Sequence, residues 1–375
     1  MRILFLTHYS KLYGANRSLI DLVIGLKNKG IIPFVICFED GDVVHVLREN
    51  KIEVIVFSYF TWMYGARREI LHFPYRFISN LIKFPKFLML VKSLRIDLIH
   101  SNSSVIQLGA YSSYFLKIPH IWHIREFGWE DYRLKCFYPE FIVNFLYKRA
   151  TYLIAISNAI KEKKLSLIKE NVKVIYNGVV SEKSIINTPK SIAKNKITFS
   201  IIGKLLPSKG QLIALKSFKS FNHQYKNSEL IIVGDGFGDY HKELLYYIEN
   251  NKLSGVVKMT GFIKDVSQIY KTTDVLLMCS HFEGMGRVTV EALSYGIPVI
   301  GYAGGGTVEL IKNNYNGYLY DDFEDEKKLA ELMIKIVESD ISFEKMSEKS
   351  LITARLYTKE KFISNFIGLL QAINF

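Results

Sequence analysis

The chain has 375 residues, of which 49% are hydrophobic and 23% are charged, and its formal net charge is +13. This is the composition of an ordinary globular protein, and the length predicts two domains rather than one core. The three cysteines are far apart, which argues against a disulfide framework and a thiolate zinc site and favours a reducing compartment.

The positive charge is concentrated in the first half of the chain. Residues 1–185 contain 26 Lys and Arg against 15 Asp and Glu, a net of +11. Residues 186–375 contain 23 against 21, a net of +2. A basic half beside a near-neutral half predicts an anionic surface or ligand on one side.

The first ten residues, MRILFLTHYS, contain a short apolar run followed by His8. We interpret this run as a β-strand, because it lacks the longer apolar stretch and the cleavage site of a signal peptide. No apolar run approaches the roughly 20 residues that span a bilayer. Apolar runs bounded by turn signals predict strands at residues 2–9, 32–40, 52–58, 97–103, 119–126 and 152–158, and at 197–204, 228–236, 256–262, 274–280 and 297–303.

Helical patterns such as residues 16–30 and 208–224 alternate with these strands. Near-continuous Ile, Val and Leu runs that alternate with helices predict an α/β fold, with doubly wound parallel sheets covered by helices on both faces. A polar stretch at residues 181–196 without clear periodicity is the predicted linker. We therefore expect a first domain at residues 1–185, a second at 186–355, and a closing amphipathic helix at 356–375 that packs back on the first domain.

The stretch at residues 67–95 carries seven basic residues and one acid, interleaved with Phe and Tyr. This pattern fits a helix that lies on an anionic membrane face. The alternative is a core helix with a solvated basic face, and the sequence leaves both open. Nucleic-acid binding is not expected, because no recognised single-strand module is present.

The stretch HFEGMGRVTVEALSYGIPVI, residues 281–300, follows a predicted strand and opens a predicted helix. Helix N-termini present unpaired N–H groups and a partial positive charge, and glycine lets the backbone approach a phosphate. Gly284 and Gly286 therefore suggest a phosphate site. Glu283 and Glu291 flank these glycines, and their carboxylates are suited to accept paired hydroxyls of a sugar ring or a ribose. For either acid alone, a solvated surface carboxylate is the simpler interpretation.

Three other stretches carry weaker signals. Lys204 follows a predicted strand and Lys209 starts a helix, so that two ammonium groups could neutralise a diphosphate. The stretch VGDGFGD, residues 233–239, has the wrong glycine spacing for a dinucleotide fingerprint, and a dehydrogenase is therefore not expected. Gly14 opens a helix after the first strand and is another candidate phosphate contact.

In this order, the motifs resemble those of glycosyltransferase family 4, whose members are retaining enzymes of the GT-B fold. The spacing of Glu283 and Glu291 is the most specific mark of that family. The resemblance extends over essentially the whole chain and is tightest in the second half. The matching segments are YGANRS, WHIREF, AISNAIKE, VIYNGV, GKLLPSKG, VGDG, GFIKDV and GGGTVELIKNNYNGYLY.

The resemblance implies a GT-B fold, in which two doubly wound Rossmann-like domains face each other across a cleft. It implies that Glu283 binds the transferred sugar and Glu291 the ribose. Lys204 and Lys209 would grip the diphosphate, and His123 would lie near the reacting face of the sugar. On its own, a histidine among apolar neighbours is usually structural. The further donor-binding residues that the resemblance implies are Gly14, Gly203, Gly234, Asp235, Gly236, Phe262, Ile263, Gly284, Met285, Gly286 and Arg287.

Two features depart from the family pattern. Tyr13 and Asn16 stand where a second glycine and an acid are more common. Lys204 stands where arginine is common, and lysine keeps the charge but loses the bidentate fork of a guanidinium. We interpret both departures as tuning of the site rather than loss of activity.

We therefore predict a retaining, metal-independent hexosyltransferase with a UDP- or GDP-linked sugar as co-substrate and no cofactor. The expected acceptor is a saccharide or a polyprenyl-diphosphate-linked saccharide in the synthesis of a capsule, O-antigen or exopolysaccharide. The expected location is the cytoplasm, peripheral on the inner face of a bacterial plasma membrane. The alternatives are a non-catalytic nucleotide-sugar-binding subunit and another GT-B activity, such as an epimerase or a soluble-acceptor synthase.

Overall fold

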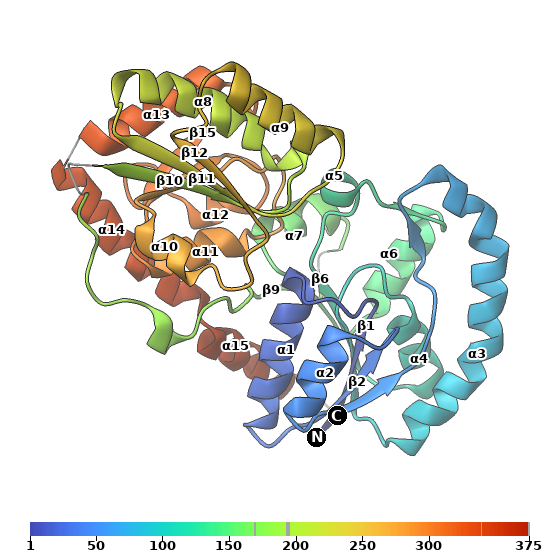
Figure 1. Cartoon of the computed structure of the whole chain (residues 1–375). Helices are drawn as coiled ribbons and strands as arrows, with labels where there is room; N and C mark the ends of the chain where they lie inside the picture. The colour runs from blue at the N-terminus through green and yellow to red at the C-terminus, as the bar shows by residue number, and fades with distance from the viewer. Residues whose placement is uncertain (169, 193–195, 339, 374–375) are drawn as a thin grey trace. The chain divides into compact units, whose positions relative to one another are not determined.

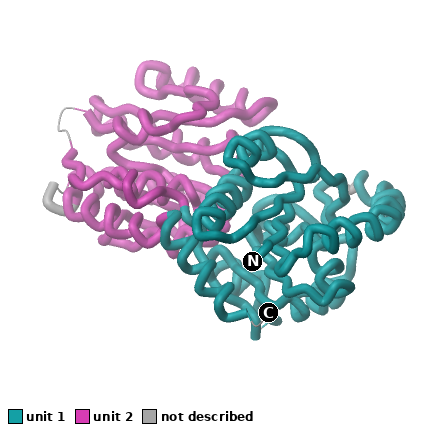
Figure 2. The backbone as a smooth tube through the Cα atoms, turned by 90° about the horizontal axis from the view of Figure 1, so that it is seen from below, with its two compact units in different colours: residues 1–178, 359–375 teal, residues 179–358 magenta. Residues whose placement is uncertain are grey.

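The computed structural model describes residues 1–168, 170–192, 196–338 and 340–373 (Figure 1). The chain divides into two compact units (Figure 2). Unit 1 consists of Met1–Gly178 and Lys359–Phe375, and unit 2 is the continuous segment Val179–Thr358. Each unit is built on one parallel sheet, which confirms the α/β prediction.

Unit 1 has a seven-stranded parallel sheet in the order β3-β2-β1-β5-β6-β8-β9. A short antiparallel pair, β4 and β7, lies apart from it. The strands are β1 (Arg2–Thr7), β2 (Ile32–Cys37), β3 (Glu53–Val56), β4 (Met63–Tyr64), β5 (Leu98–Ser101), β6 (His120–Ile124), β7 (Lys135–Cys136), β8 (Tyr152–Ala155) and β9 (Val172–Val174). The helices are α1 (Gly14–Lys27), α2 (Asp42–Glu49), η1 (Arg67–His72), α3 (Phe73–Ser93), α4 (Leu108–Leu116), α5 (Trp129–Tyr132), α6 (Glu140–Arg149), α7 (Asn158–Lys164) and α15 (Lys359–Gln371).

Alternate residues of β1 face opposite sides of the sheet, and both sides are buried. Ile3 and Phe5 join a core cluster with α1, α2 and α15. Leu4 and Leu6 join a second cluster with α3 and α4. Because side chains alternate across a strand, a run of apolar residues such as RILFL is suited to a strand covered on both faces.

Unit 2 has a six-stranded parallel sheet in the order β12-β11-β10-β13-β14-β15. Helices cover both of its faces (Figure 1). The strands are β10 (Ile197–Ile202), β11 (Ser228–Val233), β12 (Val257–Gly261), β13 (Val275–Met278), β14 (Val299–Tyr302) and β15 (Gly317–Tyr320). The helices are η2 (Glu182–Ser184), η3 (Pro207–Lys209), α8 (Gln211–Gln224), α9 (Asp239–Asn250), α10 (Ser267–Thr272), α11 (Arg287–Ser294), α12 (Thr307–Leu310), α13 (Glu326–Glu338), α14 (Asp340–Ala354) and η4 (Arg355–Tyr357).

The boundary between the units differs from the expected one by a few residues. Residues 179–185 belong to unit 2, because Val179 N–H donates to Tyr357 O at 2.9 Å and Val180 forms a bridge with Thr358. The chain then returns to unit 1, where α15 packs on α1. Lys359 pairs with Asp21 at 2.7 Å, and the apolar face of α15 completes the unit 1 core.

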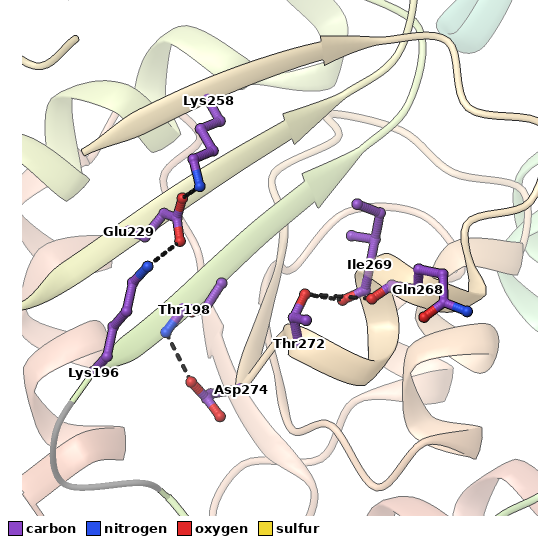
Figure 3. A network of polar contacts seen from close by, with 8 residues as sticks. All are labelled: Lys196, Thr198, Glu229, Lys258, Gln268, Ile269, Thr272 and Asp274. Carbon is purple, nitrogen blue, oxygen red and sulfur yellow. Dashed lines mark hydrogen bonds and ion pairs between the residues drawn. The ribbon is translucent and has the colours of Figure 1, made fainter. Parts of the chain in front are cut away.

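The amino-terminal edge of the unit 2 sheet carries an ion-pair network (Figure 3). Glu229 of β11 pairs with Lys196 at 2.5 Å and also with Lys258 of β12. Asp274 accepts the Thr198 N–H at 2.8 Å. These contacts join the starts of the neighbouring strands β10, β11, β12 and β13.

Candidate active site

Several of the predicted site residues lie at the carboxyl edge of the unit 2 sheet. From β10 the chain continues to β11 and β12 on one side, whereas β13, β14 and β15 lie on the other side. The loops after β10 and β13 therefore leave the sheet side by side and diverge. Such a switch point is where open α/β sheets bind ligands.

Lys209, after β10, and Glu283, after β13, meet across this switch point. The Lys209 ammonium donates to a Glu283 carboxylate oxygen, and both side chains are part-buried. The loops are also joined through the main chain, since His281 N–H donates to Ser208 O at 2.8 Å. Gly210 has a φ of 71°, and a Cβ there would lie 2.3 Å from the carbonyl oxygen of Cys279. Only glycine lets the loops approach this closely.

The glycines after Glu283 lead into α11. Gly286, with a φ of 80°, precedes the first turn, and Gly306 N–H donates to Glu283 O at 2.7 Å. A Cβ on Gly306 would lie 2.5 Å from the carbonyl oxygen of Gly284, so the loop after β14 packs directly on this segment. Met285 is buried at 3% exposure. The first turn of α11 thus begins within a few residues of the Lys209–Glu283 contact.

Glu291 lies on α11, one turn beyond Arg287. Its Oε2 accepts a hydrogen bond from the Tyr270 hydroxyl at 2.9 Å, and its Oε1 is 4.0 Å from Arg287 Nε. Tyr270 is 2% exposed. The carboxylate is therefore fixed from one side by α10 and keeps only part of its surface exposed.

The glycines after β11 have a packing reason. A Cβ on Gly234, whose φ is 148°, would lie 1.9 Å from Gly203 O, and one on Gly236 would lie 2.5 Å from Leu205 Cβ. Leu205 N–H donates to Asp235 O at 2.8 Å. The two loops are therefore in direct contact, and Lys204, in the loop after β10, is exposed.

The loop after β12 reaches the same edge. Phe262 is 67% exposed, and Ile263 is half-buried. Phe237, in the loop after β11, is 93% exposed. These rings lie in loops at the carboxyl ends of neighbouring strands.

Unit 1 contains two of the predicted site residues, Gly14 and His123. Gly14 is the first residue of α1, and the loop before it is fixed by buried Asn16. The Asn16 amide donates to Tyr9 O at 2.9 Å and to Lys11 O at 3.0 Å, and its Oδ1 accepts from the Thr7 hydroxyl at 2.6 Å. The Asn16 side chain therefore holds the loop between β1 and α1 in place. In the resembled family an acid is more common at this position.

His123 is fully buried in β6 rather than open at a strand end. Its Nδ1 lies 3.3 Å from both Arg125 Nη2 and His100 Nε2. Because arginine only donates, Nδ1 accepts and the proton is on Nε2. That Nε2 is buried and has no hydrogen-bond partner among the described residues. Burial lowers the pKa of His123 well below its ordinary value, and Arg125 and His100 lower it further, so the imidazole is neutral at pH 7.

The structure thus brings Lys209, Glu283 and the start of α11 together, and it places the loops that carry Gly203, Lys204, Gly234, Asp235, Gly236, Phe262 and Ile263 along the same sheet edge. The sequence reasoning missed Gly210, Gly306 and Tyr270. Gly306 lies within the segment GGGTVEL that carries the resemblance, and Gly210 follows Lys209, so both lay in recognised motifs. Tyr270 carried no signal, because its contact with Glu291 spans 21 residues.

Two sequence-family profiles match consecutive parts of the chain. The profile described as Glycosyltransferase Family 4 matches residues 13–183, and the profile described as Glycosyl transferases group 1 matches residues 182–351. The chain belongs to glycosyltransferase family 4. Its fold is that of the GT-B glycosyltransferases, as the expected fold class stated.

Relatives in this family include a UDP-Gal:alpha-D-GlcNAc-diphosphoundecaprenol alpha-1,3-galactosyltransferase of Escherichia coli. It is 30% identical over 250 residues, covering 62% of this chain and 64% of that protein. A poly(glycerol-phosphate) alpha-glucosyltransferase of Bacillus subtilis (strain 168) is 26% identical over 256 residues, covering 68% and 37%. The chain thus spans less than two thirds of the length of either relative.

Similar solved structures cover the whole chain. HepE of Anabaena in complex with UDP has a TM-score of 0.82 and 25% identity over 100% of both chains. The lipopolysaccharide outer core galactosyltransferase WaaB, in its apo form, has a TM-score of 0.75 and 18% identity over 99% of both chains. At that identity, the second likeness bears on the fold alone.

Proposed function

We propose that this protein transfers a sugar from a nucleoside diphosphate to a hydroxyl of a saccharide or lipid-linked saccharide, in the synthesis of a cell-surface polysaccharide. The observation that carries the proposal is the contact between Lys209 and Glu283 across the switch point, at the start of α11. Family membership, the UDP in the complex with HepE, and the saccharide acceptor in the name of the E. coli relative support it.

In this proposal, unit 2 holds the donor. The diphosphate lies at the first turn of α11, where N–H groups and the helix dipole favour an anion, and Lys204 and Lys209 add positive charge. Glu283 binds hydroxyls of the transferred sugar, and Glu291 binds the ribose hydroxyls. The exposed loops that carry Asp235, Phe262 and Ile263 lie along the base, which is uracil or guanine; the UDP in HepE favours uracil.

We further propose that the transfer retains the anomeric configuration and needs no metal ion. The bond from the anomeric carbon to the diphosphate breaks, and a bond to the acceptor oxygen forms on the same face. The acceptor proton passes to the departing phosphate oxygen. The lysines and the α11 amides stabilise the negative charge that grows on this diphosphate. His123 stays a candidate for binding a sugar hydroxyl, because its Nε2–H is buried and has no hydrogen-bond partner among the described residues.

The proposal is tested with purified protein and a panel of nucleoside diphosphates and their sugar conjugates. A bound nucleotide raises the melting temperature by mass action, and UDP or GDP is expected to do so. Lys204→Ala and Lys209→Ala are each expected to lower transfer by about 10²- to 10³-fold, because each removes preorganised positive charge. Lys219→Ala, at an exposed lysine of α8, is the control.

Transfer by Lys204→Ala and Lys209→Ala at the rate of the Lys219→Ala control would contradict the diphosphate role. Nucleotide binding without turnover on any acceptor would instead favour the alternative of a non-catalytic nucleotide-sugar-binding subunit. Epimerisation of the free donor would favour a different GT-B activity.

We also propose that unit 1 contacts the anionic inner face of a plasma membrane, through residues 67–95 and the neighbouring ends of α4 and α6. Leu81, Phe115 and Phe145 are 55–63% exposed. Phe84 of α3 contacts the Phe115 ring at 5.5 Å, and Arg149 lies over Phe145 at 5.4 Å. Helix α3 itself contains no acidic residue. Basic residues beside exposed apolar ones suit an anionic lipid surface.

Membrane binding is measured by co-sedimentation with vesicles. Vesicles containing phosphatidylglycerol are expected to retain the protein, and those of phosphatidylcholine alone are not, with the difference shrinking at high salt. Leu81→Asp is expected to weaken retention, whereas Tyr246→Asp, at an exposed site of unit 2, is the control. Equal retention on both vesicle types would count against an anionic surface.

Among the described residues, no helix combines the length and apolar character needed to cross a membrane.

A further inference from the structure

Unit 1 contains an open hollow of about 350 Å³ at the carboxyl edge of its sheet. The hollow lies where β1, β2 and β3 end, beside the point where the strand order turns from β1 to β5. This is the expected ligand position for such a sheet, and the volume falls within the range of roughly 300–1,000 Å³ for small-molecule sites. Its lining includes Phe38, Tyr59, Phe60 and Tyr64, together with His8, Glu69 and Arg76.

Two polar atoms of residues lining this hollow are buried and have no partner among the described residues. They are the hydroxyl of Tyr59, which is 2% exposed, and Nδ1 of His8. Burial lowers the pKa of His8 to about 4, against an opposing effect of the Glu126 charge, so the imidazole is neutral at pH 7. Buried polar groups without partners cost free energy, which a bound saccharide would recover where a rotation of either side chain brings its polar atom to the hollow.

Phe60 joins this hollow to α3. The Phe60 N–H donates to Asn80 Oδ1 at 2.8 Å, and the Asn80 amide donates back to Phe60 O at 2.8 Å. Around the Phe60 ring lie Arg76 at 5.9 Å, Lys83 at 5.8 Å and the Tyr75 ring at 5.6 Å. Two cations from one face of α3 thus lie at the rim of the aromatic hollow, where Arg76 pairs with Glu69 at 2.9 Å and Lys83 donates to the Ser58 hydroxyl at 2.8 Å.

Beyond these cations lies an apolar groove of about 260 Å³ on α3. It is lined by Tyr75, Ile78, Ser79, Ile82 and Lys83, whose spacing places them on one face of the helix. Ile78 and Ile82 are 53% and 68% exposed. Helix α3 runs along the outer edge of unit 1 in Figure 1. Tyr75 and Lys83 line the groove and also contact Phe60, so the two hollows adjoin.

We propose that these adjoining hollows bind an acceptor in which a saccharide is joined through phosphate to a hydrocarbon chain. The saccharide lies in the aromatic hollow, the phosphate lies between Arg76 and Lys83, and the first hydrocarbon units lie in the α3 groove. The aromatic hollow contains Arg76 in its lining, the apolar groove contains Lys83, and the two hollows adjoin, as the saccharide, phosphate and hydrocarbon parts adjoin in such a molecule. The inference rests on the proposed transferase function and assigns its acceptor to the lipid-linked class.

The test measures binding of farnesyl diphosphate to the full chain below its micellar concentration. Saturating UDP is present, so that the diphosphate cannot occupy the proposed donor site. Farnesyl diphosphate is expected to bind at least tenfold more tightly than farnesol or inorganic pyrophosphate, because only it offers both charge and hydrocarbon. Lys83→Ala and Ile82→Asp are each expected to weaken this binding roughly tenfold.

Two substitutions on the same helix are the matched controls. Lys86→Ala removes an exposed lysine outside both hollows, and Met89→Asp places a charge at another exposed apolar site. Both are expected to bind farnesyl diphosphate as the unaltered protein does. Equal effects of Lys83→Ala and Lys86→Ala, or equal binding of farnesol and farnesyl diphosphate, would overturn the assignment.

A separate readout keeps this inference apart from the proposed function. UDP binding is measured for every variant, since the donor site belongs to unit 2 and none of these substitutions lies there. Farnesyl diphosphate binding without any nucleotide binding would refute the transferase and leave a lipid-phosphate site. Nucleotide binding and transfer without farnesyl diphosphate binding would keep the transferase and refute the lipid-linked acceptor.

Discussion

The two units have parallel sheets of similar design, but their carboxyl edges are built differently. In unit 2, glycines such as Gly210 and Gly234 bring neighbouring loops into main-chain contact, and charged groups remain part-exposed. In unit 1, the edge buries His123 and Arg125 in its own hydrogen-bond network, and the open hollow is lined in part by aromatic rings. Under the proposed function, unit 2 binds a nucleoside diphosphate, which has the same shape in every donor, and unit 1 binds the acceptor, which varies; the two kinds of edge would suit these two ligands.

The largest expected contrast between the units is their response to acid. Burial lowers the pKa of His120 to about 3 and lowers the pKa values of His100 and His123 well below the ordinary value. In the unfolded chain these groups take up protons below pH 6.5, so stability falls as pH drops from there towards the folded pKa values. At pH 5.5, each of these histidines costs about 1.4 kcal/mol, and His8, whose pKa burial lowers to about 4, costs a similar amount, so unit 1 is expected to lose roughly 6 kcal/mol.

Tryptophan fluorescence isolates this effect, because all three tryptophans, Trp62, Trp122 and Trp129, lie in unit 1. The urea midpoint read from fluorescence is expected to fall sharply between pH 7.5 and 5.5. His120→Gln removes one titrating group and is expected to flatten this dependence, with His45→Gln at an exposed site as the control. A midpoint that does not move with pH would contradict the buried, neutral histidines.

A smaller effect is expected from the close loop contact of unit 2. Gly210→Ala places a Cβ 2.3 Å from Cys279 O at a φ of 71°, and we expect a loss of about 2 kcal/mol in unit 2 stability and weaker UDP binding. Circular dichroism measures the stability. Gly255→Ala, where a Cβ meets nothing within 4 Å, is the control. Equal stability and UDP affinity in the two variants would show that Lys209 does not depend on this contact.

The smallest effect is expected at the opposite edge of unit 2. Burial raises the pKa of Glu229, but hydrogen bonds and charges of Lys196 and Lys258 outweigh it and hold the pKa below the ordinary value. A lowered carboxyl pKa adds stability above pH 4.5 that is lost as pH falls through the folded pKa. Glu229→Gln is expected to cost about 1 kcal/mol at pH 7 and less in acid. Thermal unfolding at both pH values checks it, and no change in UDP binding is expected.

The sequence was sufficient for the predicted core strands and for the helix that begins just after Glu283, Gly284 and Gly286, because both depend on local patterns. Runs such as RILFL predict buried strands, and glycines beside a helix start predict an anion site. The strands β4, β7, β9 and β15 were missed, because the first three have only two or three residues and β15, with the sequence GYLY, lacks the run of Ile, Val and Leu that marks the predicted strands. The enclosure of His123 could not be foreseen, because the side chains around it include His100 and Phe362, which are distant in sequence. The hollow at Phe60 likewise depends on Asn80, inside α3, and Gln107, at the start of α4, whose side-chain amides donate to the Phe60 carbonyl and which lie 20 and 47 residues along the chain.

The route of the chain through the two units has a consequence for biosynthesis. Unit 2 is one uninterrupted segment, whereas unit 1 needs α15, whose Phe362, Phe366 and Leu369 fill its core. On the ribosome, unit 2 can therefore finish folding while the first 178 residues still wait for their last helix. A nascent chain stalled before residue 359 would expose the apolar side of α1 to chaperones. A premature stop codon at that point would leave unit 2 complete and unit 1 without the helix that completes its core.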